Sequence, residues 1–93
     1  MISVGLDKLN KMDYAGAIFA FKKALGGAND EAAYVYAQMG ECYRNSNENR
    51  NATAMYARAV QAYRKLITDG RQIDKANEGI RLCENGIKLC SSE

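Results

Sequence analysis

The sequence contains no histidine, no tryptophan and no proline. Histidine is the most frequent general base and metal ligand in proteins, so its absence removes the usual starting point for catalytic or metal chemistry. Acidic residues are scattered, and there is no glycine-rich phosphate loop. We therefore expect no enzymatic activity, no catalytic residues, no cofactor and no metal site. Because proline is missing, no residue rigidly interrupts the chain.

Cysteine is scarce, and its spacing argues against disulfides. The three cysteines are Cys42, Cys83 and Cys90, and no two of them form a C-x-x-C pair. On a helix, Cys83 and Cys90 would lie about 10.5 Å apart along the axis, which is too far for a bridge. Buried thiols in a reducing compartment fit this pattern best, and we predict a cytoplasmic protein.

Long hydrophobic runs and a strong charge are also missing. No apolar segment approaches the roughly 18 residues that a membrane span needs, and the first residues lack the basic start of a signal peptide. The formal net charge is only +2 over 93 residues. We therefore expect one small domain, residues 1–93, with no membrane partner and no nucleic-acid ligand.

The residues that are present indicate helices throughout. The interruptions are the pair Gly26-Gly27, the polar run 45–49 and the pair Asp69-Gly70. Adjacent glycines end a helix readily, and Gly70 suits the left-handed residue just past a helix end. Short connections make successive helices antiparallel neighbours. The apolar spacing predicts helices over residues 2–11, 13–25, 30–45, 49–68 and 71–90.

Short polar residues before these segments are suitable N-caps, because their side chains can accept hydrogen bonds from the first turn. We expect Asp13 to cap the second helix. Asn29 or Asp30 is expected to cap the third, and Ser46 or Asn47 the fourth.

An internal repeat joins the first four predicted helices. Four residues recur 35 positions later as the same or a similar residue, and a period of this length indicates a supersecondary unit stacked on a copy of itself. The four pairs are Gly5/Gly40, Ala17/Ala52, Phe21/Tyr56 and Ala24/Ala59.

The second unit reads Tyr36-x-x-Met39-Gly40-x-x-Tyr43 and then Ala52-x-x-x-Tyr56-x-x-Ala59. This pattern resembles the tetratricopeptide repeat, although the period here is 35 rather than 34 and no proline closes either unit. Residues 13–25 are similar to the second helix of that family. The resemblance covers about residues 1–67, and the abrupt start of the first helix suggests a fragment of a longer protein or a short variant. It implies an all-α, antiparallel helix-pair solenoid of two units, about 1–29 and 30–68, with a capping helix over about 71–90.

The repeated residue types have a mechanical interpretation. Small residues allow two helices to approach closely, and large ones fill the space between them. We expect Gly5, Gly40, Ala17 and Ala52 at the close contacts. The aromatic residues Phe21, Tyr56, Tyr36 and Tyr43 are then expected to fill the gap between neighbouring units.

The last predicted helix does not carry the repeat. Apolar residues in steps of three and four predict that one face covers the end of the stack. Gly79 and Gly86, seven residues apart on this helix, indicate either a close helix contact or a merely tolerant terminal helix. The apolar stripe consists of Ile73, Ala76, Ile80, Cys83, Ile87 and Cys90.

The resemblance also implies a function. In the family, the first helices of successive units line a concave groove that binds a peptide or an amphipathic helix of another protein, so we expect an adaptor or scaffold. A clamp for the terminal carboxylate of a heat-shock chaperone is not expected, because only Asn10 and Asn45 fit it. The groove residues implied by the frame are Ile2, Leu6, Leu9, Tyr34, Ala37, Glu41, Arg44, Asn45, Glu78 and Arg81.

Three alternatives stay open. The stripe Ile2, Leu6 and Leu9 packs against the chain's own second helix or against an upstream helix missing here, or it is a binding face, or it is a surface for homodimerisation through the open N-terminal end. Single-stranded RNA binding of the pentatricopeptide type has a similar period, but low net charge and only two units argue against it. The somewhat long second helices also resemble vesicle-fusion adaptors related to soluble attachment proteins, which would leave the adaptor function unchanged.

Overall fold

A computed structural model describes residues 2–26 and 31–91 of the chain. These residues form helices joined by short turns and include no strand, which confirms the predicted all-α class. The helices are α1 (Ile2–Asn10), α2 (Tyr14–Leu25), α3 (Ala32–Asn45), α4 (Asn49–Thr68) and α5 (Ile73–Ser91).

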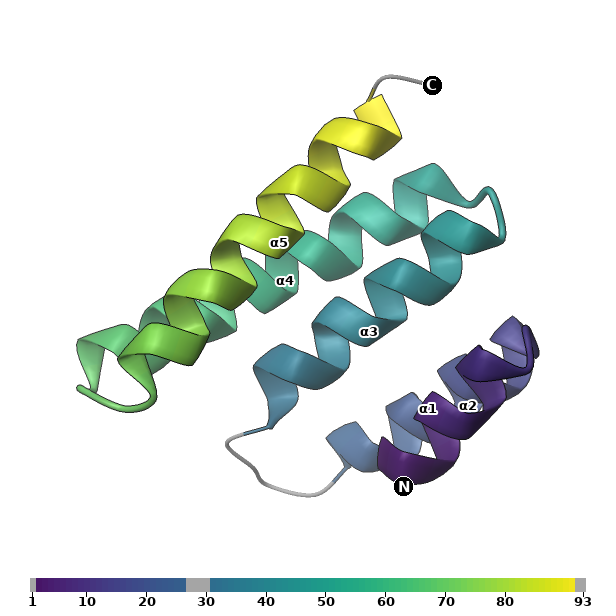
Figure 1. Cartoon of the computed structure of the whole chain (residues 1–93), viewed down its shortest axis with the longest axis horizontal. Helices are drawn as coiled ribbons and strands as arrows, with labels where there is room; N and C mark the ends of the chain where they lie inside the picture. The colour runs from purple at the N-terminus through teal and green to yellow at the C-terminus, as the bar shows by residue number, and fades with distance from the viewer. Residues whose placement is uncertain (1, 27–30, 92–93) are drawn as a thin grey trace.

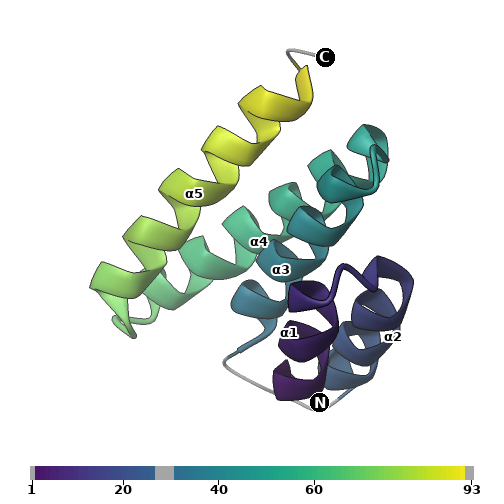
Figure 2. The ribbon, with the colours of Figure 1, turned by 45° about the vertical axis from the view of Figure 1, so that its right-hand side comes forward.

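The helices pack as neighbouring antiparallel pairs (Figure 1). Helix α3 lies between the α1–α2 pair on one side and the α4–α5 pair on the other, and Figure 2 shows the same order after rotation. The Cα atoms span 35 × 31 × 17 Å, and the shortest dimension accommodates two layers of helices. Since α3 and α5 are both antiparallel to α4, they run in the same direction above it (Figure 1).

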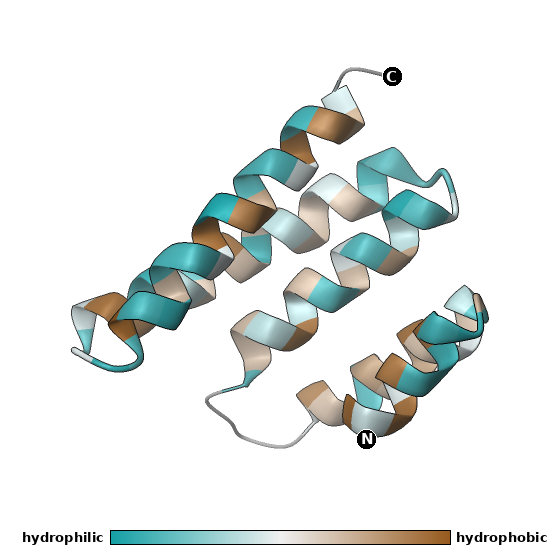
Figure 3. Cartoon of the chain, in the orientation of Figure 1, coloured by the Kyte–Doolittle hydropathy of each residue, from teal (hydrophilic) through white to brown (hydrophobic). Residues whose placement is uncertain are grey.

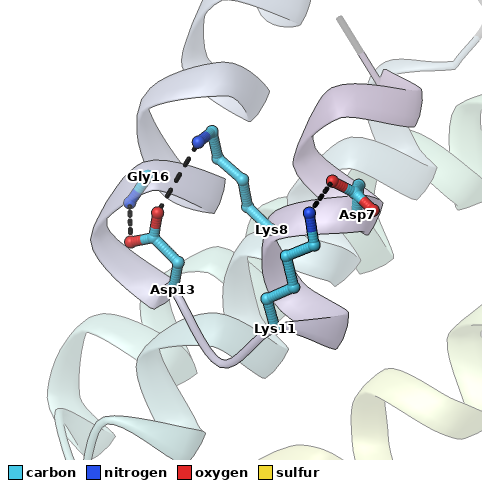
Figure 4. A network of polar contacts seen from close by, with 5 residues as sticks. All are labelled: Asp7, Lys8, Lys11, Asp13 and Gly16. Atoms are coloured by element: carbon cyan, nitrogen blue, oxygen red, sulfur yellow. Dashed lines mark hydrogen bonds and ion pairs between the residues drawn. The ribbon is translucent and has the colours of Figure 1, made fainter.

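The predicted cap of α2 is confirmed (Figure 4). Asp13 Oδ1 accepts a hydrogen bond of 3.0 Å from the backbone N–H of Gly16, and Asp13 Oδ2 lies 3.6 Å from Lys8 Nζ. Met12 adopts φ = 62°, which turns the chain sharply between α1 and α2. The Asp13 side chain therefore starts α2 and also ties it to α1.

The start of α4 differs from the prediction. Ser46 and Asn47 end α3 instead of capping α4, because Asn47 adopts the left-handed φ of 64° and Ser46 N–H donates back to Cys42 O. Glu48 is the residue before α4, and its side chain makes no cap hydrogen bond. Gly70 has the predicted left-handed φ of 72°. The caps proposed at Asn29 or Asp30, and the break at Gly27, lie outside the described residues.

The repeat has a direct structural counterpart. A Cβ atom on Gly5 would lie 2.6 Å from Cε1 of Phe21, and one on Gly40 would lie 2.7 Å from Cδ1 of Tyr56. The two residues of each pair are 16 positions apart in the sequence. Each aromatic ring thus lies against the glycine of its own unit, where a side chain would collide with it. Phe21 also packs with Val35 and Met39 of α3, so it fills the space toward the next unit as predicted and lies against the glycine of its own unit as well.

Tyr56 bridges two contacts. Its ring lies against Gly40 on α3 and also against Gly86 on α5, where an added Cβ would be 2.6 Å from Cζ. Ala17 and Ala52 are fully buried, as predicted for close contacts between helices. This one aromatic side chain therefore packs α4 against α3 on one side and against α5 on the other.

The buried face of α5 consists of small residues. A Cβ atom on Gly79 would collide with the ring of Tyr63, so both glycines of this helix serve close approach to α4. The predicted apolar stripe is accordingly shifted, since Ile80 and Ile87 are only half-buried and Ile73 is exposed. Branched side chains lie on the flanks because the rings of α4 occupy the centre. The buried residues of α5 are Ala76, Gly79, Cys83, Gly86 and Cys90.

Two hydrophobic clusters meet at α3. The first joins α1 and α2 to α3 through Phe21, Val35 and Met39, and the second joins α3, α4 and α5 around Tyr56 and Tyr63. Figure 3 shows hydrophobic and hydrophilic residues interspersed along each helix, as expected where one face is buried. Helix α3 therefore contributes buried residues to both clusters.

Thiol burial makes the stability depend on pH. Burial, with a contribution from Glu41, raises the pKa of Cys42 to about 11 and the pKa of Cys83 to about 11, from a usual value of 9.0. Above pH 9 the unfolded chain releases thiol protons that the folded chain retains, so the free energy of unfolding falls as the pH rises. We expect the urea midpoint to be level below pH 9 and to decrease between pH 9 and 11.

The matched control is the double variant Cys42→Ala/Cys83→Ala, in which this decrease should become shallower. Tyr56 and Tyr63, whose pKa values burial raises to about 12, produce the decrease that remains at higher pH. An identical pH profile in the wild type and in the double variant would contradict the assignment of the linkage to the thiols.

Candidate functional site

Helices α3 and α5 form the walls of a groove, and α4 forms its floor. A hollow of about 520 Å³ at the wide end adjoins a narrower one of about 90 Å³, and both are lined by Tyr34, Tyr63, Gly79 and Leu82. We name these two hollows together the α3–α5 groove. The wide end is also lined by Glu31, Leu66, Gln72, Lys75 and Glu78. The narrow end is also lined by Ala37, Gln38, Glu41, Tyr56 and Cys83.

Two large apolar side chains from opposite walls lie over this groove. Tyr34 of α3 is 39% exposed and Leu82 of α5 is 59% exposed. Tyr63 lies between them on the floor and is almost fully buried. Gly79 leaves room for the Tyr63 ring against the α5 backbone, so the local sequence of α5 sets the depth of the groove.

A polar network closes the narrow end. Arg44 Nη2 donates to Glu41 Oε2 at 2.6 Å, and Arg44 Nε donates to Tyr56 Oη at 3.2 Å. Hydrogen bonds to Tyr56 and Glu41 raise the pKa of Arg44, and burial raises the pKa of Tyr56 to about 12. Arg44 and Glu41 are therefore neutralised by each other and anchored to the core hydroxyl.

Of the ten residues predicted for the groove, four line it together: Tyr34, Ala37, Glu41 and Glu78. Arg44 belongs to the network beneath the narrow end, and Asn45 is exposed at the last residue of α3. Arg81 lines a separate shallow depression along α5 with Leu82, Glu84, Asn85 and Lys88. The three residues from α1 are half-buried against the first cluster: Ile2, Leu6 and Leu9.

The sequence reasoning missed several residues of the groove. Leu82 is the more exposed of the two apolar side chains on the groove walls. It falls outside the regular apolar stripe of α5, and this position could have marked it as a surface residue. Tyr63 lies outside the repeated positions, and its ring forms the floor. Lys75 and Glu31 line the wide end and carry no signal in the apolar pattern.

Within residues 2–26 and 31–91, no three side chains of histidine, cysteine, aspartate or glutamate gather in a way that could bind a metal ion. The three cysteines are buried and free. None of the five helices, as far as they are described, combines the length and the apolar character needed to cross a membrane.

Comparison of the chain with protein-family models, with curated proteins and with solved structures gives no match.

Proposed function

We propose that this chain is a protein–protein interaction module of the tetratricopeptide type, which binds a peptide or helix of a partner protein in the α3–α5 groove. The observation that carries this proposal is the pair Tyr34 and Leu82, which stand exposed on facing helices above a hollow floored by Tyr63. Exposed apolar residues gathered at a concave site are typical of binding surfaces. The module acts as an adaptor or scaffold and has neither an enzymatic activity nor a cofactor.

The repeated packing supports the assignment to this class of module. Gly5 against Phe21 and Gly40 against Tyr56 are the same contact in two successive units, at the same separation in the sequence. Helix pairs built on one recurring contact stack into a solenoid, and solenoids present concave surfaces to partners. The free, buried thiols agree with a reducing compartment such as the cytoplasm.

The groove exists before a partner arrives. The rings of Tyr56 and Tyr63 lie against glycines of α5, and Tyr56 also contacts α3, so the walls and the floor are held together by the core. A preformed site avoids much of the entropy loss that ordering a loop would cost. Since the backbone groups of both walls are engaged in helical hydrogen bonds, recognition depends on side chains, which suits a helix laid into the groove.

A terminal carboxylate is a poor ligand for this site. Three carboxylates line the groove, from Glu31, Glu41 and Glu78, against one ammonium group, that of Lys75. They would repel the carboxylate that heat-shock chaperones present, so we propose binding without such a clamp. The same carboxylates oppose the phosphates of single-stranded RNA, which argues against RNA binding of the pentatricopeptide type in this groove.

Homodimerisation through the N-terminal end remains a second proposal for partners. The repeat frame places Val4 and Asp7 of α1 where α3 has the buried Met39 and Cys42. Val4 is exposed and would favour an apolar contact. Asp7 pairs with Lys11 at 3.1 Å, and a dimer would have to cover this charged pair. Molar mass measured over a range of concentrations decides the question.

The groove is tested by selecting helical peptides on the wild-type chain and then measuring their affinity for variants. We expect the double variant Tyr34→Ala/Leu82→Ala to bind at least about tenfold more weakly, because both apolar anchors are removed. Fluorescence anisotropy measures the affinity, and circular dichroism verifies the fold.

The control variant is Phe19→Ala, which removes an aromatic side chain that is 61% exposed on α2, away from the groove. Its affinity should match the wild type. Equal binding by the groove variant and the wild type would place the site elsewhere and remove the proposal.

A further inference from the structure

We infer that the partner helix carries a lysine or arginine one turn away from its apolar anchor, and that this basic side chain lies between Glu31 and Glu78 at the wide end of the α3–α5 groove. This inference rests on the proposed function and adds the chemistry of the partner. Its starting point is a contrast in charge between the groove and the rest of the chain.

The groove is acidic within a chain that is slightly basic. Apart from Glu41, which Arg44 neutralises, its lining has two carboxylates and one ammonium group, whereas the whole chain has 13 basic and 11 acidic residues. Non-specific attraction to the whole molecule therefore favours acidic partners, and a preference for basic ones must come from the groove. Complementary charge of this kind contributes more to the choice of partner than to affinity.

The free carboxylates lie at one end only. Glu41, at the narrow end, is paired with Arg44 at 2.6 Å. Glu31 and Glu78, at the wide end, are exposed, and in the described part of the chain neither side chain has an ion-pair partner. A basic group of a partner would therefore be placed at the wide end, where two carboxylates are unpaired.

The spacing relates the charged contacts to the apolar ones. Glu31, the residue directly before α3, precedes Tyr34 by three positions, and Glu78 precedes Leu82 by four residues on α5. Glu78 thus lies one helical turn before Leu82 on the same face of α5, and Glu31 lies at the start of α3, ahead of Tyr34. A partner helix whose apolar residue meets Tyr34 and Leu82 needs its basic residue one turn along its own axis to reach both carboxylates.

The length of the groove fixes the size of the occupant. The wall on this side extends from Glu31, directly before α3, to Glu41 on α3, a separation of ten positions that corresponds to about 15 Å along a helix axis. About three turns of a partner helix fill this length. An isolated helix of that size is marginal in water, so the partner segment is expected to become helical on binding or to belong to a longer helix.

The test uses two synthetic amphipathic peptides of roughly four turns. Both carry leucines at three- and four-residue spacing, and they differ only in having lysine or glutamate one turn from the central leucine. We expect the lysine peptide to bind the wild-type chain about three- to tenfold more tightly than the glutamate peptide, as for two exposed ion pairs. The preference should shrink as the salt concentration rises.

Variants of the chain separate the wide end from other acidic sites. Glu31→Gln/Glu78→Gln should remove the preference for lysine, and Glu31→Lys/Glu78→Lys should reverse it in favour of the glutamate peptide. The matched control is Glu84→Gln, which removes a carboxylate from the same helix, about 120° around its axis from Glu78, where it faces Arg64 at 3.9 Å. This control should keep the wild-type preference.

The outcomes distinguish the inference from the proposed function. Equal affinity for the two peptides, together with amide shift changes at Tyr34 and Leu82, would overturn the inference and leave the groove in place. Binding with shift changes only outside the groove, or no binding by either peptide, would overturn both. A reversed preference in the double lysine variant is the result that establishes the inference.

Discussion

Replacing Tyr56 by alanine is expected to lower the free energy of unfolding by about 3–5 kcal/mol. The side chain is only 1% exposed, and its ring lies against Gly40 of α3 and Gly86 of α5. Removing the ring would leave a cavity where three helices meet, and no neighbouring side chain can fill it, because both facing residues are glycines. A small domain is stable by only about 5–15 kcal/mol, so this loss would remove a large share of its free energy of unfolding.

Two control variants separate the ring from its hydroxyl and from simple loss of size. Tyr56→Phe keeps the ring and loses only the hydrogen bond from Arg44, so it should cost about 1–2 kcal/mol. Tyr34→Ala deletes the same number of atoms from a side chain that is 39% exposed, and it should cost less than about 1 kcal/mol.

Urea denaturation followed by far-ultraviolet circular dichroism measures all three free energies. A loss below about 1 kcal/mol for Tyr56→Ala would contradict the packing described, because it would mean that the ring does not fill the space between the helices.

The importance of Tyr56 could be predicted from the sequence only in part. The offset of 35 residues pairs Gly40 with Gly5 and Tyr56 with Phe21, and it therefore identifies a recurring contact between a small residue and a large one. Helix positions followed from apolar spacing because each helix has one buried face. Asp13 was identifiable as a cap because its chemistry is local.

The spacing of Gly79 and Gly86 indicated a possible close contact of the last helix, but it did not identify Gly86 as the second partner of Tyr56. Gly86 lies outside the repeat, and a search for apolar periodicity does not count glycine as a buried residue. The buried line of α5 consists of small residues, so the same search assigned its isoleucines to the centre of the face. Only the three-dimensional fit of two α4 rings against two α5 glycines fixes which side of α5 is buried.

The groove was predictable to the same extent. Tyr34, Ala37 and Glu41 followed from the first helix of the second unit, because the family frame identifies its exposed concave side. Leu82 did not follow, since its orientation depends on how α5 lies on α4. The register of that contact is set by Tyr63 against Gly79 and by Tyr56 against Gly86, so the core of the domain determines which residues of α5 reach a partner.

The register is tested by replacing Gly79 with alanine, a substitution whose usual effect on the free energy of unfolding we expect to be reversed here. In an exposed helix, replacing glycine by alanine stabilises by about 1 kcal/mol, because alanine loses less backbone entropy and has the higher helix propensity. For Gly79→Ala we expect the opposite, a loss of about 1–3 kcal/mol, since the new methyl group would collide with the ring of Tyr63. The ring is held in the core at 8% exposure and cannot turn aside without disturbing α4.

A double-mutant cycle isolates the contact from general effects on the helix. In the background Tyr63→Leu the collision partner is shorter, so the loss caused by Gly79→Ala should decrease, and the coupling energy between the two sites should be about 0.5–3 kcal/mol. Gly79→Ala should also lower the affinity for peptides bound in the α3–α5 groove, because any shift of Tyr63 changes the floor between Tyr34 and Leu82. If Gly79→Ala instead stabilises the wild-type chain by about 1 kcal/mol, Gly79 is exposed, α5 lies on α4 with another face, and Leu82 is not a wall of the groove.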